Sequence, residues 1–145
     1  MTTQLYPRSP KVLLGGMVHL ARFIDKIRLR HAGHIQDYNY ITVGFDKYLL
    51  DFLQIRGEEL EQRVLHGGTD EGLLAWVQAN SRPLSPEDIR QWNARILKAT
   101  PKDEAAHQRF QTRLAEVAAK RGVHIQVLPR PTTWVDIIEL DEGRL

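Results

Sequence analysis

Three Ser-Pro or Thr-Pro pairs mark places where this chain can begin a helix. They are Ser9-Pro10, Ser85-Pro86 and Thr100-Pro101. A hydroxyl side chain can cap the free N–H groups of a first helical turn, and proline at the first helical position loses no hydrogen bond. An acid three residues after the hydroxyl, at Asp88 and Asp103, adds the second half of a capping box in two of the pairs. These signals favour a chain built from helices.

Apolar residues support this interpretation because they recur at intervals of three and four residues. Leu73, Trp76 and Val77 share one helical face, as do Phe110 and Leu114. We therefore predict helices over residues 11–14, 17–31, 45–54, 58–66, 70–80, 86–98 and 102–121. Gly67 and Gly122 follow two of these segments and suit left-handed helix ends.

Two segments alternate with a period near two instead. Residues 38–43 and 123–128 are rich in β-branched or aromatic side chains, which is typical of short strands. The predicted fold class is therefore mainly α, as a single compact helical domain over residues 1–145, with or without one short β element. A length of 145 residues suits one domain.

Composition excludes several classes of protein. The chain has no cysteine, which removes disulfides, thiol nucleophiles and cysteine-based metal sites. No apolar run approaches the roughly 20 residues that span a bilayer, and the first residues lack the apolar core of a secretory signal. We expect a cytoplasmic protein with no membrane partner.

Charge is arranged in blocks, although the net charge is only +2. Residues 1–34 hold six Lys or Arg and a single acid, whereas residues 35–89 hold four basic and ten acidic residues. Residues 90–131 are basic again, and the segment from Thr132 is acidic. Each basic block thus has an acidic block available to it, so neutralisation within the chain is the first explanation and attraction of nucleic acid is the second.

The predicted helix over 17–31 has two contrasting sides. Its apolar side carries Met17, Leu20, Ala21, Ile24 and Ile27. The opposite side carries what we call the basic stripe, which consists of His19, Arg22, Lys26 and Arg30. Like charges four residues apart repel one another by about 0.2–0.5 kcal/mol in an isolated helix. We therefore expect groups outside this helix to meet the basic stripe.

Three kinds of partner fit the basic stripe. Acidic side chains of the same chain, among them Asp46 and Asp51, would make ordinary ion pairs. A small phosphate or carboxylate could instead be held by Arg22 and Lys26, with His19 exchanging a proton near neutral pH. The third candidate is a nucleic-acid backbone. Gly15-Gly16, close to the predicted start of the helix, adds weak support for an anion, because free N–H groups at a helix start bind anions.

Motifs along nearly the whole chain resemble those of a known family. They are Tyr6-Pro7-Arg8-Ser9-Pro10, Leu14-Gly15-Gly16, His19-Leu20-Ala21-Arg22, Asp25-Lys26-Ile27-Arg28, Tyr38-Asn39-Tyr40, Phe45-Asp46, Asp51-Phe52-Leu53-Gln54-Ile55, Asp70, Leu74-Ala75-Trp76, Trp92-Asn93, Thr133-Trp134-Val135-Asp136 and Asp141-Glu142-Gly143-Arg144. The chain resembles an uncharacterised bacterial family of domains of unknown function (DUF5069 type). The family has glycine where this chain has Gln54, and often an acid where this chain has Arg130-Pro131. The resemblance implies one domain and brings no reaction, substrate or cofactor.

The residues on these motifs define a candidate site. Arg22 and Lys26 would hold a small anion, and His19 is the candidate for proton transfer. The other candidate ligand-binding residues are Asp25, Tyr38 and Asp46. A polar set with aromatic rings is typical of small-molecule sites. The leading hypothesis is a pocket for a phosphate or carboxylate ligand, with catalysis left open and no cofactor indicated.

Other patterns in the sequence give less specific indications of function. His31 and His34 have spacing that a metal could use, but two histidines make an incomplete ligand set, and we predict no metal site. The predicted helix over 102–121 carries a second basic stripe, made of Lys102, Arg109, Arg113 and Lys120. Two basic helices could follow a phosphate backbone, which makes a nucleic-acid-binding accessory protein the first alternative function. A protein-interaction or structural module is the second.

Overall fold

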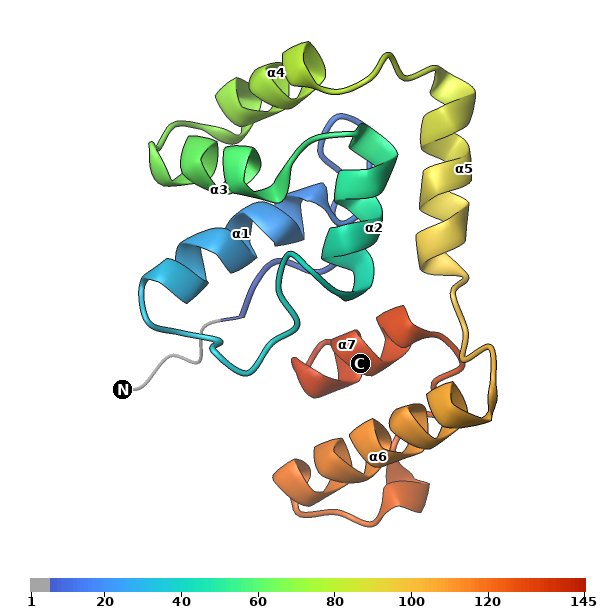
Figure 1. Cartoon of the computed structure of the whole chain (residues 1–145). Coiled ribbons are helices and arrows are strands. Elements are labelled where there is room, and N and C mark those ends of the chain that lie inside the picture. The colour runs from blue at the N-terminus through green and yellow to red at the C-terminus, as the bar shows by residue number, and fades with distance from the viewer. Residues whose placement is uncertain (1–5) are drawn as a thin grey trace. The chain divides into compact units, whose positions relative to one another are not determined.

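The computed structural model describes residues 6–145, and within that range it has seven α-helices and one 3₁₀ turn (Figure 1). The elements are α1 (Leu20–His31), α2 (Gly44–Leu53), α3 (Gly57–Leu65), α4 (Asp70–Asn80), α5 (Pro86–Leu97), α6 (Glu104–Arg121), η1 (Ile125–Val127) and α7 (Trp134–Asp141). The predicted class is confirmed, because the described residues are mainly helical. No helix among the described residues has the length and apolar character needed to cross a membrane.

The start of the chain differs from the prediction. Residues 11–14 are not a helix, and α1 begins at Leu20 rather than at residue 17. Leu14 and Met17 exchange backbone hydrogen bonds of 3.1 Å across Gly15-Gly16, both of which have positive φ. Two glycines with positive φ form a two-residue hairpin turn. The glycine pair therefore reverses the chain before α1 instead of providing free N–H groups at its start.

The strand pair that the two alternating segments allowed is absent from the described residues. Residues 38–43 are bends and irregular chain, and residues 123–128 contain η1. Alternation was misleading here because neither segment finds a partner strand for its backbone groups. A further helix, α7, follows Pro131, and the Thr133 hydroxyl and the Asp136 carboxylate cap its first turn reciprocally.

Gln54 ends α2 in a backbone conformation that is unusual for a residue other than glycine. It is the C-cap of α2 and lies in the left-handed region, with φ 58°. Glycine adopts that conformation without steric cost, whereas a residue with a Cβ atom adopts it less readily. Gly122 ends α6 in the same conformation, as predicted.

The chain divides into two units, the first ending at Ala94 and the second running from Arg95 to Leu145. In the first unit, α1 packs against α3, and α3 packs against α4. Phe52 stacks on Trp92 with ring centroids 5.0 Å apart. The largest buried side chains of this unit are Met17, Leu20, Phe23, Ile24, Ile27, Leu49, Leu53, Leu60, Leu73 and Trp92. The expectation of a single domain stays a prediction.

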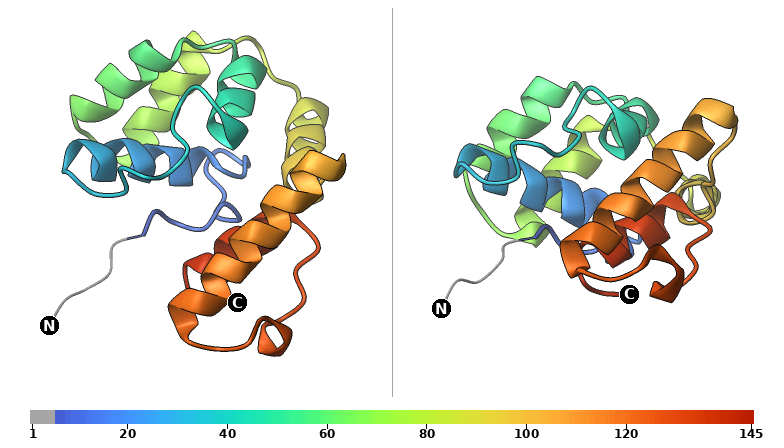
Figure 2. Two further views of the ribbon diagram at one scale, coloured as in Figure 1. Left: turned by 60° about the horizontal axis from the view of Figure 1, so that its bottom comes forward. Right: turned by 90° about the horizontal axis from the view of Figure 1, so that it is seen from below.

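In the second unit, α7 lies alongside α6, and η1 follows the end of α6 (Figure 2). The buried cluster between them consists of Val117, Ala118, Leu128 and Leu140, with Leu114 and Ile125 packed against it. Phe110 meets Trp134 edge to face at 5.2 Å. Pro131 lies between η1 and α7 and has no backbone N–H, so it separates the two helical segments.

Candidate functional site

The basic stripe of α1 is largely buried. His19, Arg22 and Lys26 are 2%, 3% and 5% exposed. Asp46, in the first turn of α2, is 1% exposed. Charged side chains this deep need compensating partners, because burial without them is costly. The groups that contact the basic stripe therefore decide whether it serves packing or ligand binding.

Asp46 is the acceptor at the centre of this group. His19 Nε2 lies 2.7 Å from Asp46 Oδ1, and Lys26 Nζ donates to Asp46 Oδ2 at 2.8 Å. The first expectation, that acidic groups elsewhere in the chain meet the stripe, is met at Lys26. We call His19, Lys26 and Asp46 the buried triad.

Two strained residues supply contacts to Asp46. His19 precedes α1 with φ 74°, and Ile41 has φ 56°. The Ile41 N–H donates to Asp46 Oδ2 at 3.1 Å. Positive φ is unusual outside glycine and is most costly for a β-branched residue. Such strain persists only where the surrounding structure enforces it, and it is frequent at functional sites.

Burial and the neighbouring charges favour a neutral His19 imidazole hydrogen-bonded to an ionised Asp46 carboxylate. Burial lowers the pKa of His19; the Asp46 contact opposes this, and the charges of Lys26 and Arg22 add to it. Burial alone would raise the pKa of Asp46, but the His19 and Lys26 contacts outweigh it and hold that pKa below its usual value. The proton of neutral His19 therefore sits on Nε2, which donates to Asp46.

This tautomer leaves a lone pair on His19 Nδ1. That atom is buried and has no hydrogen-bond partner among residues 6–145. The rings of Phe45 and Phe23 lie beside the imidazole, with centroids 5.7 and 6.2 Å away. A buried acceptor without a partner costs about 1–3 kcal/mol. The arrangement places a carboxylate-oriented base in apolar surroundings.

Side chains of α5 hold the backbone that leads into His19. Asn93 accepts from the Val18 N–H at 2.9 Å and donates to the Gly16 carbonyl at 2.8 Å. The Trp92 indole N–H donates to the Val18 carbonyl at 3.0 Å. These contacts fix the hairpin turn and, through it, the conformation of His19.

Arg22 lies one turn along α1 from His19, so the two side chains share a face of the helix. Its Nη1 donates to the Arg8 carbonyl at 3.2 Å, and its guanidinium carbon lies 5.9 Å from the centroid of the Tyr38 ring. Tyr38 is half-buried. The structure thus places Arg22 and Tyr38 together.

Asp25 lies in a separate cluster. Its carboxylate accepts from the Arg8 backbone N–H and from Arg8 Nε, at 2.8 and 2.9 Å. Arg8 also donates to Asp70, the first residue of α4, at 2.6 Å. The structure therefore does not bring Asp25 to the buried triad. We call Arg8, Asp25 and Asp70 the Arg8 cluster.

A comparison with protein families matches one of them. The sequence model described as "Domain of unknown function (DUF5069)" matches residues 4–144, which is nearly the whole chain. The chain belongs to the DUF5069 family. No curated protein matches this DUF5069 member.

Among the residues that position the site of this DUF5069 member, Arg8, Ile41, Trp92 and Asn93 were not candidates. Asn93 and Arg8 lie on motifs of the resemblance, so their side-chain chemistry was a signal that could have found them. Ile41 gave no such signal, because only its backbone N–H contacts Asp46. It also lines a surface hollow of about 280 Å³ with Gly57.

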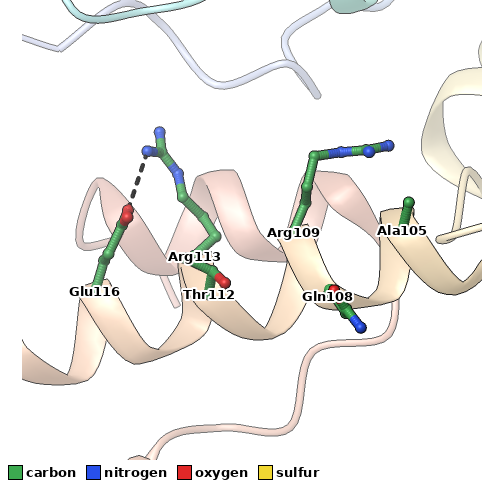
Figure 3. A pocket seen from close by; sticks show the side chains of 6 residues that line it. All are labelled: Ala105, Gln108, Arg109, Thr112, Arg113 and Glu116. Carbon is green, nitrogen blue, oxygen red and sulfur yellow. Dashed lines mark hydrogen bonds and ion pairs between the residues drawn. The ribbon is translucent and has the colours of Figure 1, made fainter.

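The second basic stripe, on α6, is partly neutralised within its own unit. Lys120 Nζ lies 2.8 Å from Asp141 Oδ1, and Arg113 lies 3.4 Å from Glu116 and 3.9 Å from Asp141. Arg109 and Arg113 line an open hollow of about 430 Å³ along the exposed side of α6 (Figure 3). All its lining residues come from this one helix.

His31, the last residue of α1, and His34 lie apart from these groups. His31 Nε2 is 3.1 Å from Glu61 Oε2, which also accepts from the Tyr40 hydroxyl at 2.6 Å. Among residues 6–145, no group of three His, Asp or Glu side chains has metal-binding geometry. The Glu61 contact gives His31 a role in joining α1 to α3.

Proposed function

We propose that this DUF5069 member binds a small anionic molecule beside the buried triad, with His19 as the group that accepts a proton or hydrogen bond from it. One observation carries the proposal: His19 Nδ1 is a buried acceptor with no partner among residues 6–145. A hydroxyl or N–H group of a ligand would satisfy it.

The environment of His19 suits a general base. Asp46 accepts the Nε2 proton, which orients the ring and keeps the lone pair on Nδ1. If His19 accepts a proton from a ligand, the imidazolium that forms lies 2.7 Å from the Asp46 carboxylate, which stabilises it. Proton transfer at this nitrogen is the chemistry that the triad supports.

The anionic part of the ligand would contact Arg22. A guanidinium binds carboxylate or phosphate through two parallel hydrogen bonds, and the Tyr38 ring lies beside this one. Lys26 is already hydrogen-bonded to Asp46, so its role is to hold Asp46 charged. The proposed ligand therefore carries a carboxylate or phosphate together with a hydrogen-bond donor.

A structural or interaction module is the alternative with specific support. Lys26 is paired with Asp46, and Lys120 with Asp141, as expected if the basic stripes serve packing. A nucleic-acid function using two basic helices has less support. Arg22 and Lys26 are too deeply buried to contact a phosphate backbone without rearrangement.

A thermal-shift screen tests the proposal. The ligands are inorganic phosphate, phosphorylated and carboxylated metabolites, nucleotides and mixed-sequence DNA and RNA. A ligand at 100 times its Kd stabilises the folded state by about 2.7 kcal/mol, which raises the melting temperature measurably. We expect a hit among the small anions, and a shift that is lost in Arg22→Gln.

Two substitutions of His19 form a matched pair. His19→Gln places an amide near the Nε2 position and can still donate to Asp46, but it has no acceptor in place of Nδ1. His19→Asn places its amide near the Nδ1 position and loses the contact with Asp46. The proposal requires the ligand shift to disappear in His19→Gln while that variant stays folded. An unchanged shift in His19→Gln, or no shift with any small anion, would show that the proposal is wrong.

A further inference from the structure

The segment before the hairpin turn is hydrogen-bonded to two residues of the site. Pro7 and Pro10 are buried, and Arg8 and Ser9 are partly buried. We call residues 7–10 the strap. The Pro10 carbonyl accepts from the His19 N–H at 2.9 Å, and the Arg8 carbonyl accepts from Arg22 Nη1 at 3.2 Å. The strap thus contacts the backbone of His19 and the side chain of Arg22, the proposed anion-binding residue.

One side chain anchors the strap. Arg8 donates through its backbone N–H, Nε and Nη2 to Asp25, at 2.8, 2.9 and 3.1 Å. Its Nη1 and Nη2 also donate to Asp70, at 2.6 and 3.1 Å. A single guanidinium therefore joins the strap to α1 and to the start of α4.

The anchor is one that can be released. The Arg8 side chain is 34% exposed, and those of Asp25 and Asp70 are 21% and 28% exposed. Ion pairs with this exposure are screened by salt more strongly than the contacts of the buried triad. Release of Arg8 would remove the side-chain contacts of the strap with α1 and α4 while the contacts of Asp46 with His19 and Lys26 stay in place.

We infer that the strap is a lid over the site, held closed by the Arg8 cluster, and that its opening admits the ligand to His19 Nδ1 and Arg22. This inference rests on the proposed function and adds how access of the ligand to the site is controlled. When the strap opens, the anion takes the place of the Arg8 carbonyl as the hydrogen-bond acceptor for Arg22. Loops that close over sites commonly exclude water and control access in this way. Asp25, which lies apart from the triad, acts here by holding the lid.

The inference can be tested without a ligand. Diethyl pyrocarbonate acylates the free nitrogen of a neutral imidazole, so the labelling rate of His19 measures how often Nδ1 is exposed. The rate is followed by peptide mass spectrometry, with the exposed His107 of α6 as the internal reference. We compare the natural chain with Arg8→Ala and Asp70→Asn, and use Arg56→Ala as the control. Arg56 is 75% exposed and its ion pairs are long, at 3.6 and 3.7 Å.

We expect Arg8→Ala to raise the His19 rate between about 5- and 30-fold, which corresponds to the loss of one or two kcal/mol from the closed state. Asp70→Asn should give a smaller rise, Arg56→Ala none, and added NaCl should raise the rate of the natural chain. An unchanged His19 rate in Arg8→Ala overturns the inference.

Global unfolding is the competing explanation, and urea denaturation of each variant distinguishes it. If the lower free energy of global unfolding fully accounts for the rise in the His19 labelling rate, the proposed local opening of the strap is wrong. Because labelling needs no ligand, the two proposals fail separately. A failed ligand screen removes the proposed function and with it the ligand that the lid would admit, but not the opening of the strap, whereas an unchanged labelling rate removes only the lid.

Discussion

His19 Nε2 lies 2.7 Å from Asp46 Oδ1, and neither side chain is more than 2% exposed. This contact joins the residue before α1 to the first turn of α2, 27 positions along the chain. It fixes the tautomer of the imidazole, the charge of the carboxylate and the direction of the free lone pair. The stability and the chemistry of the site therefore depend on the same hydrogen bond.

The first prediction concerns pH. Because the folded chain holds the pKa of His19 below its ordinary value of 6.5, the unfolded chain binds the proton first as the pH falls. The His19 contribution is thus fully present above about pH 6.5 and decreases below it, by at most about 1.4 kcal/mol per pH unit. The pKa of Asp46 is also lowered, so its contribution is lost only near and below 3.8.

Urea unfolding at about pH 5 and about pH 8 measures this difference. The matched variant is His19→Gln, which cannot bind the proton but keeps a donor toward Asp46. The difference between the two pH values should be smaller in His19→Gln than in the natural chain. Equal pH dependence in both chains would mean that His19 is not held neutral.

The second prediction concerns the charge of Asp46. Asp46→Asn keeps the shape of the side chain but removes the carboxylate that compensates Lys26, which is 5% exposed. Removing one partner of a buried ion pair costs about 3–5 kcal/mol. Asp51→Asn is the control on the same helix, because Asp51 pairs with Lys47 at the surface and its side chain is 61% exposed. That change should stay within about 0.5 kcal/mol.

A double-mutant cycle isolates the pair. Lys26→Met removes the charge that Asp46→Asn leaves behind, so the double variant should be less unstable than the sum of the two single variants. Free energies of unfolding from urea denaturation provide the four values. Additive losses would show that the 2.8 Å contact between Lys26 and Asp46 adds no coupling.

The third prediction concerns the strained backbone at Ile41. A Cβ atom at Gly57 would lie 2.7 Å from Ile41 Cγ2 and 3.2 Å from Leu50 Cδ1. Gly57→Ala should therefore displace Ile41, whose N–H donates to Asp46, and cost about 1–3 kcal/mol. Gly72→Ala, in α4, meets its first neighbour only at 3.4 Å and should gain up to about 1 kcal/mol of helix propensity. Thermal unfolding of both variants tests this, and equal stability would contradict it.

Helix positions could be predicted because their signals are local. Thr69 and Ser85 accept backbone hydrogen bonds in the first turns of α4 and α5, as predicted, and Gly122 ends α6. The predicted cap at Thr100 is wrong, because Asp103 is itself the N-cap of α6. The same local approach missed α7, although Thr133 and Asp136 form a complete capping box. It also allowed a short strand pair at 38–43 and 123–128, because alternation does not reveal whether a partner strand exists.

The amino-acid sequence by itself determined the mainly helical class, most helix boundaries, and the two contrasting sides of α1. Only the tertiary structure decided that the basic stripe is buried at Lys26 and His19, that Asp46 rather than Asp51 meets it, and that Asp25 pairs with Arg8. The physical reason is the distance along the chain over which each effect acts. Capping and helical periodicity act over a few residues, whereas burial and charge compensation depend on groups 17 to 27 positions apart, which only the folded chain brings together.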